Sequence, residues 1–248
     1  MAGNTNVIAS DILNRVAAEV GMQPVAAPLE SQDPFFVQLR YLLNTAGEEL
    51  MQAFPWEQLV RSHTILTQAG DTGAYALPDD FGHITNQSAW DNTNRLQLGG
   101  PLSASEWTRL RGRDLASSTI YTSFRIAQSR FNVYPTPPSA GVNLSFEYIT
   151  IDWVLDEATD PTRPVYKSEV TLPSDRPLFD KTLITRALKV KYLEAGGFDT
   201  TKAQDDYNQI FKFLTGTDKG APVLNAGRGR GSFPYLSMNN VGDTGYGL

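Results

Sequence analysis

The hydrophobic period changes twice along this chain, and that change limits the folds open to it. In residues 5–20, apolar side chains recur every three or four positions, as on one face of a helix. From Trp56 to about Trp153 the period shortens toward two, which is typical of half-buried strands. After a polar, proline-containing loop, the helical period returns up to about residue 215. Helical ends around a strand-rich middle predict an α+β fold with an inserted β domain.

Two helices are expected before the insertion. The first covers residues 5–20 and ends near Gly21. The second opens at Asp33, an N-cap residue followed by proline at the first helical position, and Pro55 ends it. The two apolar stripes consist of Val7, Ile8, Ile12, Val16 and Val20, and of Phe35, Leu39, Leu42, Leu43, Ala46 and Leu50.

Two further helices are expected after the insertion. Ser174 or Asp175 can cap the first, which Gly196-Gly197 breaks, and Asp199 or Thr200 can cap the second. Their inward residues are Leu178, Leu183, Ile184, Ala187, Leu188 and Tyr192, then Tyr207, Ile210, Phe211 and Leu214. The predicted architecture is a helical bundle made by residues 1–55 and 166–215, with an antiparallel β domain at 56–165.

The inserted block contains strand-like segments separated by turns. These segments are HTILTQ, YALP, HITNQSAW, RIAQSRFNVYP and VNLSFEYITIDWV. One short helix is expected inside the block, from Ser103 to about Arg111. Ser103 and Glu106 form a capping box there, because each side chain can bond the other residue's free backbone N–H.

Residues 216–248 differ in composition from the rest of the chain. Eight of these 33 residues are glycine and few are apolar, so the segment cannot build its own core. We expect an extended tail that is disordered or laid along a partner. GRGRG at 227–231 is no phosphate loop, since no strand precedes it and no GK[ST] follows. It could form a basic contact with an acidic partner or with nucleic acid, or it could be a solvated flexible linker. The candidate partner-binding residues are Arg228, Arg230, Phe233, Tyr235, Leu236 and Met238.

Composition excludes several classes of site. The chain has no cysteine, so disulfides, thiol nucleophiles and sulfur-ligated metals are ruled out. Its formal net charge of −6 argues against a broad basic surface that grips a phosphate backbone. The absence of cysteine is compatible with assembly in the cytoplasm. The first residues lack the pattern of a secretory signal, and no apolar run is long enough to span a bilayer.

The segment YALPDDFGHITNQSAWD, residues 75–91, offers the first candidate chemistry. Asp79, Asp80 and His83 could form an acid–base pair oriented by a carboxylate. They could equally end a strand, with Pro78 fixing φ and the aspartates bonding free backbone N–H groups. We favour the turn, with Phe81 packed inward, because the turn accounts for the residue types and GxSxG is absent.

Metal and sugar sites receive little support. His63 and His83 would need added carboxylates to hold zinc, HExxH is absent, and His63 alternates with Ile65 as in an ordinary strand. Trp90, Trp107 and Trp153 could form a sugar platform, although core filling is the commoner role of tryptophan in a β block. Nothing in the spacing of the 27 acidic residues selects a glycosidase pair. We therefore assign no catalytic residue, metal ligand or cofactor.

The order of several motifs resembles a known family. In chain order the motifs are FPWEQLVR, YALPDDF, Trp90-Asp91, PLSASEWTRLRGR, FRIAQSRFNVYPTP and LSFEYITIDWV, and a helix pair follows them. In this order they resemble the head-to-tail adaptor (connector) proteins of short-tailed bacteriophages, of the tail tubular protein A type. The resemblance covers roughly residues 5–215 and includes no catalytic signature.

This resemblance implies a structural virion protein in the phage neck. It implies a ring of about twelve copies below the portal, with the tail nozzle beneath and the C-terminal segment reaching the portal. Double-stranded DNA would pass through the lumen during ejection without specific binding, helped by an acidic wall. Glu48, Glu49, Asp205 and Asp206 are candidates for that wall, or merely for a solvated helix face. A virion-associated peptidoglycan hydrolase and a glycan-binding tail module remain alternatives.

Overall fold

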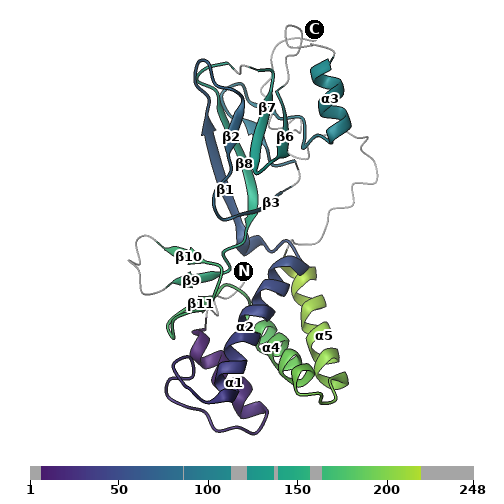
Figure 1. The fold of residues 1–248 in the computed structure, drawn as a ribbon. Coiled ribbons are helices and arrows are strands. Elements are labelled where there is room, and N and C mark those ends of the chain that lie inside the picture. The colour runs from purple at the N-terminus through teal and green to yellow at the C-terminus, as the bar shows by residue number, and fades with distance from the viewer. Residues whose placement is uncertain (1–6, 86, 113–121, 137–138, 157–163, 219–248) are drawn as a thin grey trace, which may run out of the picture.

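The computed structural model describes residues 7–85, 87–112, 122–136, 139–156 and 164–218. A helical bundle carries a separate β-rich body, whose strands β1 (Val60–Leu66) and β8 (Asn143–Thr150) extend to the bundle (Figure 1). Helices and antiparallel sheets occur together, which confirms the predicted α+β fold class. The tail predicted at 216–248 lies outside the described residues from 219 onward.

Four helices make the bundle. They are α1 (Ala9–Glu19), α2 (Pro34–Ala53), α4 (Lys181–Ala195) and α5 (Thr201–Asp218). Helix α4 is central because it contacts each of the other three, whereas α1 and α5 lie on opposite sides of it (Figure 1). The N- and C-terminal helices therefore share one bundle, as their apolar stripes predict.

Side-chain caps fix where the helices begin. The Asp33 carboxylate accepts the Phe35 N–H at 2.9 Å, and the Ser103 backbone N–H donates to Glu106 at 2.9 Å, as predicted. The cap predicted for α4 at Ser174 or Asp175 is wrong. Asp180 fills that role, accepting the N–H groups of Thr182 and Leu183. The helix begins later than predicted because strand β11 (Arg176–Pro177) precedes it.

Three antiparallel sheets complete the fold. The first contains β1 (Val60–Leu66), β8 (Asn143–Thr150), β4 (Trp90–Asp91) and β5 (Leu96–Gln97), and β3 (Phe81–Ile84) also pairs with β8. The second has the order β2 (Ala74–Ala76), β7 (Arg130–Tyr134), β6 (Ser123–Ala127). The third, small sheet has the order β10 (Val165–Lys167), β9 (Val154–Asp156), β11 (Arg176–Pro177). The first two sheets, with α3 (Ala104–Gly112), are called the β body below.

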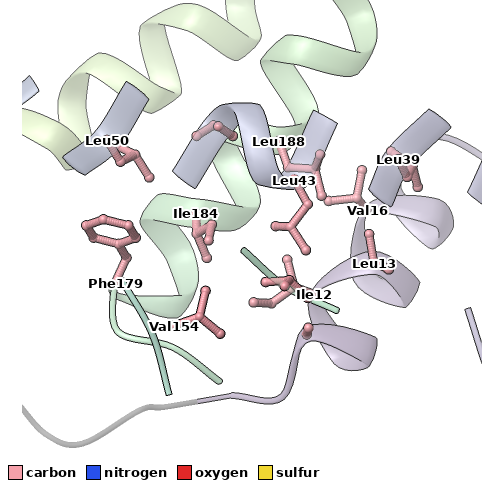
Figure 2. Packing of buried hydrophobic residues seen from close by; sticks show 14 of the residues in the cluster. Ile12, Leu13, Val16, Leu39, Leu43, Leu50, Val154, Phe179, Ile184 and Leu188 are labelled. Carbon is pink, nitrogen blue, oxygen red and sulfur yellow. The ribbon is translucent and has the colours of Figure 1, made fainter. Parts of the chain in front are cut away.

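Each part has its own apolar core. In the β body, the ring of Phe131 stacks on those of Phe124 and Phe146, with centroid distances of 4.7 and 4.8 Å, which joins the first two sheets. In the bundle, helix side chains meet Val154 from the small sheet and Phe179 from the segment before α4 (Figure 2). The small sheet therefore belongs to the bundle core, while the domain limits drawn from the sequence stay predictions.

Trp153 is held tightly within the bundle core. Its ring is fully buried and stacks on Phe179 with centroids 5.8 Å apart. Helix α2 can lie against this ring only because residue 47 is glycine. A Cβ at Gly47 would lie 2.2 Å from two ring carbons, closer than any real contact.

Candidate functional site

The YALPDDF segment is the turn between β2 and β3. The Phe81 N–H donates to the Pro78 carbonyl at 3.1 Å, and the Phe81 ring packs against the β-body core, as expected. The two Asp80 carboxylate oxygens accept the hydroxyls of Tyr148 and Thr150, each at 2.8 Å. Asp79 is exposed. The carboxylate of Asp80 is thus engaged by two buried strand residues 68 and 70 positions away in sequence.

His83 does not face the Asp80 carboxylate. It pairs with Ile149 on β8 and is exposed. Tyr148 and Thr150, which bond Asp80, point to the other face of β8 from Ile149 because successive strand residues alternate. The sheet register therefore separates the two groups that an acid–base pair would have to bring together.

The same register separates the two histidines. His63 pairs with Phe146, and their rings lie 5.5 Å apart, whereas His83 pairs with Ile149. Phe146 and Ile149 are three positions apart on β8, so the histidines lie on opposite faces of the sheet. Within the described ranges, no group of three or more His, Cys, Asp or Glu residues could hold a metal ion.

The three tryptophans do not form one platform. Trp153 is fully buried in the bundle core, while Trp90 lies in β4 and Trp107 in α3 of the β body. The Trp107 ring meets Tyr134 edge-on, with centroids 6.3 Å apart. A sugar-binding face needs exposed rings in one plane, and these residues are distributed over the bundle and the β body.

A small pocket lies where α2, α4 and α5 meet. It has a volume of about 110 Å³, and its lining includes Ala46, Ala187, Glu49, Lys191 and Tyr207. Lys191 Nζ lies 2.7 Å from Glu49 Oε1, and this hydrogen bond raises the pKa of Lys191. Burial, followed by the Glu49 charge, raises the pKa of the Tyr207 phenol. The ion pair closes one wall of the pocket.

The predicted acidic wall residues differ in their contacts. Besides the Glu49 pair, Asp206 lies 2.7 Å from Lys202 Nζ and 3.6 Å from Arg186, so its charge is partly balanced within the helices. Glu48 and Asp205 are exposed on α2 and α5.

Among the residues that the structure describes, helix α5 is covered on one side only. Ala203 is its one buried residue, and its apolar side chains Tyr207, Ile210, Phe211 and Leu214 are only partly buried. Phe213 is 67% exposed. Phe213 and Thr217 lie four positions apart on the exposed side of the helix, called the α5 flank below. This flank is a candidate contact surface in the described residues.

Asp175 is a structural residue whose role the sequence did not reveal. It is fully buried, and its Oδ2 accepts the N–H groups of Thr171 and Leu172 at 2.7 Å and pairs with Lys167 at 2.8 Å. Its carbonyl accepts the Ala9 N–H at 2.8 Å, which ties the start of α1 to this loop. Aspartate inside a turn is the only sequence signal for such a role.

The candidate partner-binding residues of the tail lie outside the described residues, from Arg228 to Met238. No described helix is long and apolar enough to cross a bilayer. A family model described as SU10 adaptor protein matches residues 8–230. A search of curated proteins found no match.

Proposed function

Because this chain belongs to the SU10 adaptor protein family, and is thus a phage structural adaptor, we propose that it forms a ring between head and tail. In this proposal the ring links the portal to the tail nozzle in the virion neck, in the manner of the tail tubular protein A type. The observation that carries the proposal is the extent of the family match, which takes in both the bundle and the β body.

The exposed α5 flank supports self-assembly. In a closed ring each subunit meets two identical neighbours through two different surfaces. Helices α1 and α5 lie on opposite sides of α4, so they provide two such surfaces on opposite sides of the bundle (Figure 1). We assign the α5 flank, with its exposed Phe213, to the contact with the next copy, because burying a large aromatic ring favours association.

The remaining parts of the proposal follow from charge and composition. A net charge of −6, repeated in about twelve copies, would surround the channel with negative charge and let DNA slide without being held. The tail residues Arg228, Arg230, Phe233, Tyr235, Leu236 and Met238 are proposed to contact the portal. The hydrolase and glycan alternatives gain no residue set from the structure, since Asp80 is engaged and the tryptophans are dispersed.

Electron microscopy of the full chain, alone and mixed with the portal protein of the same phage, tests this proposal. We expect rings with a central channel, at least on the portal. Phe213→Asp should abolish them while leaving the circular dichroism spectrum and Tm unchanged. Phe198→Asp is the matched control, because Phe198 is 59% exposed but lies in the α4–α5 turn. No ring on the portal would refute the function, and intact rings of Phe213→Asp would refute the assigned contact.

A further inference from the structure

The β body joins the bundle through two adjacent strands. The chain enters the body at Val60, leaves it after Thr150, and the ladder between β1 and β8 begins at the pair Val60–Ile149. Figure 1 shows both strands running down to the level where the small sheet meets the bundle. We call residues 60–61 and 148–152 the neck. Strand β3 also pairs with β8 here, through Phe81–Thr150, His83–Ile149 and Ile84–Tyr148, so only residues 151–152 of the neck lie beyond both ladders.

The turn before β3 supplies a third support. Besides the two hydroxyl bonds to its carboxylate, Asp80 accepts the Ile151 N–H with its backbone carbonyl at 2.9 Å. Ile151 lies beyond the last residue of β8, so Asp80 reaches past the end of the ladder. The Thr150 oxygen in turn accepts the Asp152 N–H at 3.0 Å. Asp80 thus bonds Tyr148, Thr150 and Ile151 directly, and it reaches Asp152 only through Thr150.

The donor residues of these bonds are buried. Thr150 is fully buried and Tyr148 is 5% exposed, whereas Asp80 itself is half-buried. Burial limits how readily the two hydroxyls exchange Asp80 for solvent. Gly82, two residues after Asp80 in β3, lies very close to the neck. A Cβ there would come within 2.7 Å of the Ile149 carbonyl oxygen, so glycine permits the tight approach.

The small sheet contacts the neck through the other strand, β1. Arg61 on β1 lies over the ring of Tyr166, with the guanidinium carbon 4.2 Å from the centroid. Tyr166 belongs to β10, whose small sheet contributes Val154 to the bundle core. On the side of the bundle, the neck therefore contacts the small sheet through Arg61 and the bundle core through Val60 and Ile149. On the side of the β body, Asp80 adds its bonds to the ladder between β3 and β8.

We propose that Asp80 is a positioning residue, a clasp that fixes the orientation of the β body on the bundle. When the clasp is open, the body can swing about the neck while both cores stay folded. The function of such a clasp is to present the β body at one angle in every subunit. The proposal concerns the single chain and stands whether or not the protein forms a ring.

Spin-label distance measurements test the clasp directly. The chain has no cysteine, so two labels can be attached through introduced cysteines. One is Leu66→Cys, at the far end of β1, and the other is Gln209→Cys, at an exposed position of α5. Dilution with unlabelled chain removes distances between copies. We expect one narrow distance in the parent, loss of that single distance in Asp80→Ala, and no change in Asp79→Ala, the exposed neighbour in the same turn.

A second variant keeps the test decisive if Asp80→Ala fails to fold. Tyr148→Phe combined with Thr150→Val removes both hydroxyl donors and leaves Asp80 in place. We expect this double variant also to lose the single narrow distance at an unchanged helix content. A narrow distance in either folded variant, equal to that of the parent, would overturn the proposal, and so would an equal broadening in Asp79→Ala.

Discussion

Replacing Gly47 by alanine should destabilise the protein, although alanine is the better helix former. Gly47 lies inside α2, where alanine normally gains about 1 kcal/mol over glycine. Here the added Cβ would meet three atoms of the Trp153 ring at 2.2, 2.2 and 2.6 Å. Carbon atoms prefer separations of about 3.5–4.0 Å, so either the ring or the helix must move.

The size of the stability loss depends on how far helix α2 and the Trp153 ring can move apart. Overpacking a core by one methyl group costs about 1–3 kcal/mol, and three contacts with a fully buried ring place Gly47→Ala at the upper end. After the helix-propensity gain is subtracted, we expect a net loss of about 2 kcal/mol. For a chain of this size that loss lowers Tm by about 4–8 °C.

Thermal melting followed by circular dichroism at the helix band measures the effect. Gly216→Ala is the matched control, because Gly216 lies in α5, has nothing within 4 Å of its would-be Cβ, and should show no loss. Adding Trp153→Phe should make Gly47→Ala less harmful than it is alone, since the smaller ring leaves room. A Gly47→Ala chain as stable as the parent would refute the packing argument.

Two further predictions concern aspartates near the bundle. Asp180→Ala should lower stability by about 1–2 kcal/mol in urea unfolding because two N–H groups of α4 lose their acceptor, and an equal loss in Ser174→Ala would contradict this. Burial, and then the Asp80 charge, raise the pKa of Asp152 against the opposing effect of Arg61. Between the ordinary and the raised pKa the folded chain binds more protons than the unfolded one, so stability falls as pH rises through that window. Asp152→Asn should therefore raise Tm at pH 7 and lose this advantage in acid, and a gain that is equal at both pH values would refute the assignment.

Local sequence signals predicted the helices more reliably than their junctions. The Asp33 and Ser103–Glu106 caps depend on residues at most three positions apart, so the sequence alone indicates them. The α4 cap was misplaced because Arg176–Pro177 pair with β9, a contact that no local period reveals. The alternation of apolar and polar residues in VNLSFEYITIDWV predicts that Trp153 belongs to a strand, yet it lies beyond the end of β8 and packs in the bundle core.

The candidate site shows the same division. The turn at YALPDDF could be predicted from Pro78 and the aspartates, but the role of Asp80 depends on hydroxyls 68 and 70 positions away. The sequence alone gives no register between β3 and β8, and the register is what separates His83 from Asp80 and His63 from His83. The one-sided cover of α5 likewise depends on how α4 packs against it, and the sequence alone does not give that packing.

The tie between α1 and the loop before α4 has a consequence during synthesis. Ser10 donates to the Pro173 carbonyl, a partner 163 positions later in the chain. On the ribosome, α1 and α2 therefore emerge long before α4 exists to cover their apolar stripes. At ordinary translation rates this wait lasts on the order of ten seconds. Once the ladder between β1 and β8 has formed, it brings the end of α2 close to the start of the segment that leads to α4. The effective loop between the two helical halves is then short, which lowers the entropy cost of packing α4 against α1 and α2.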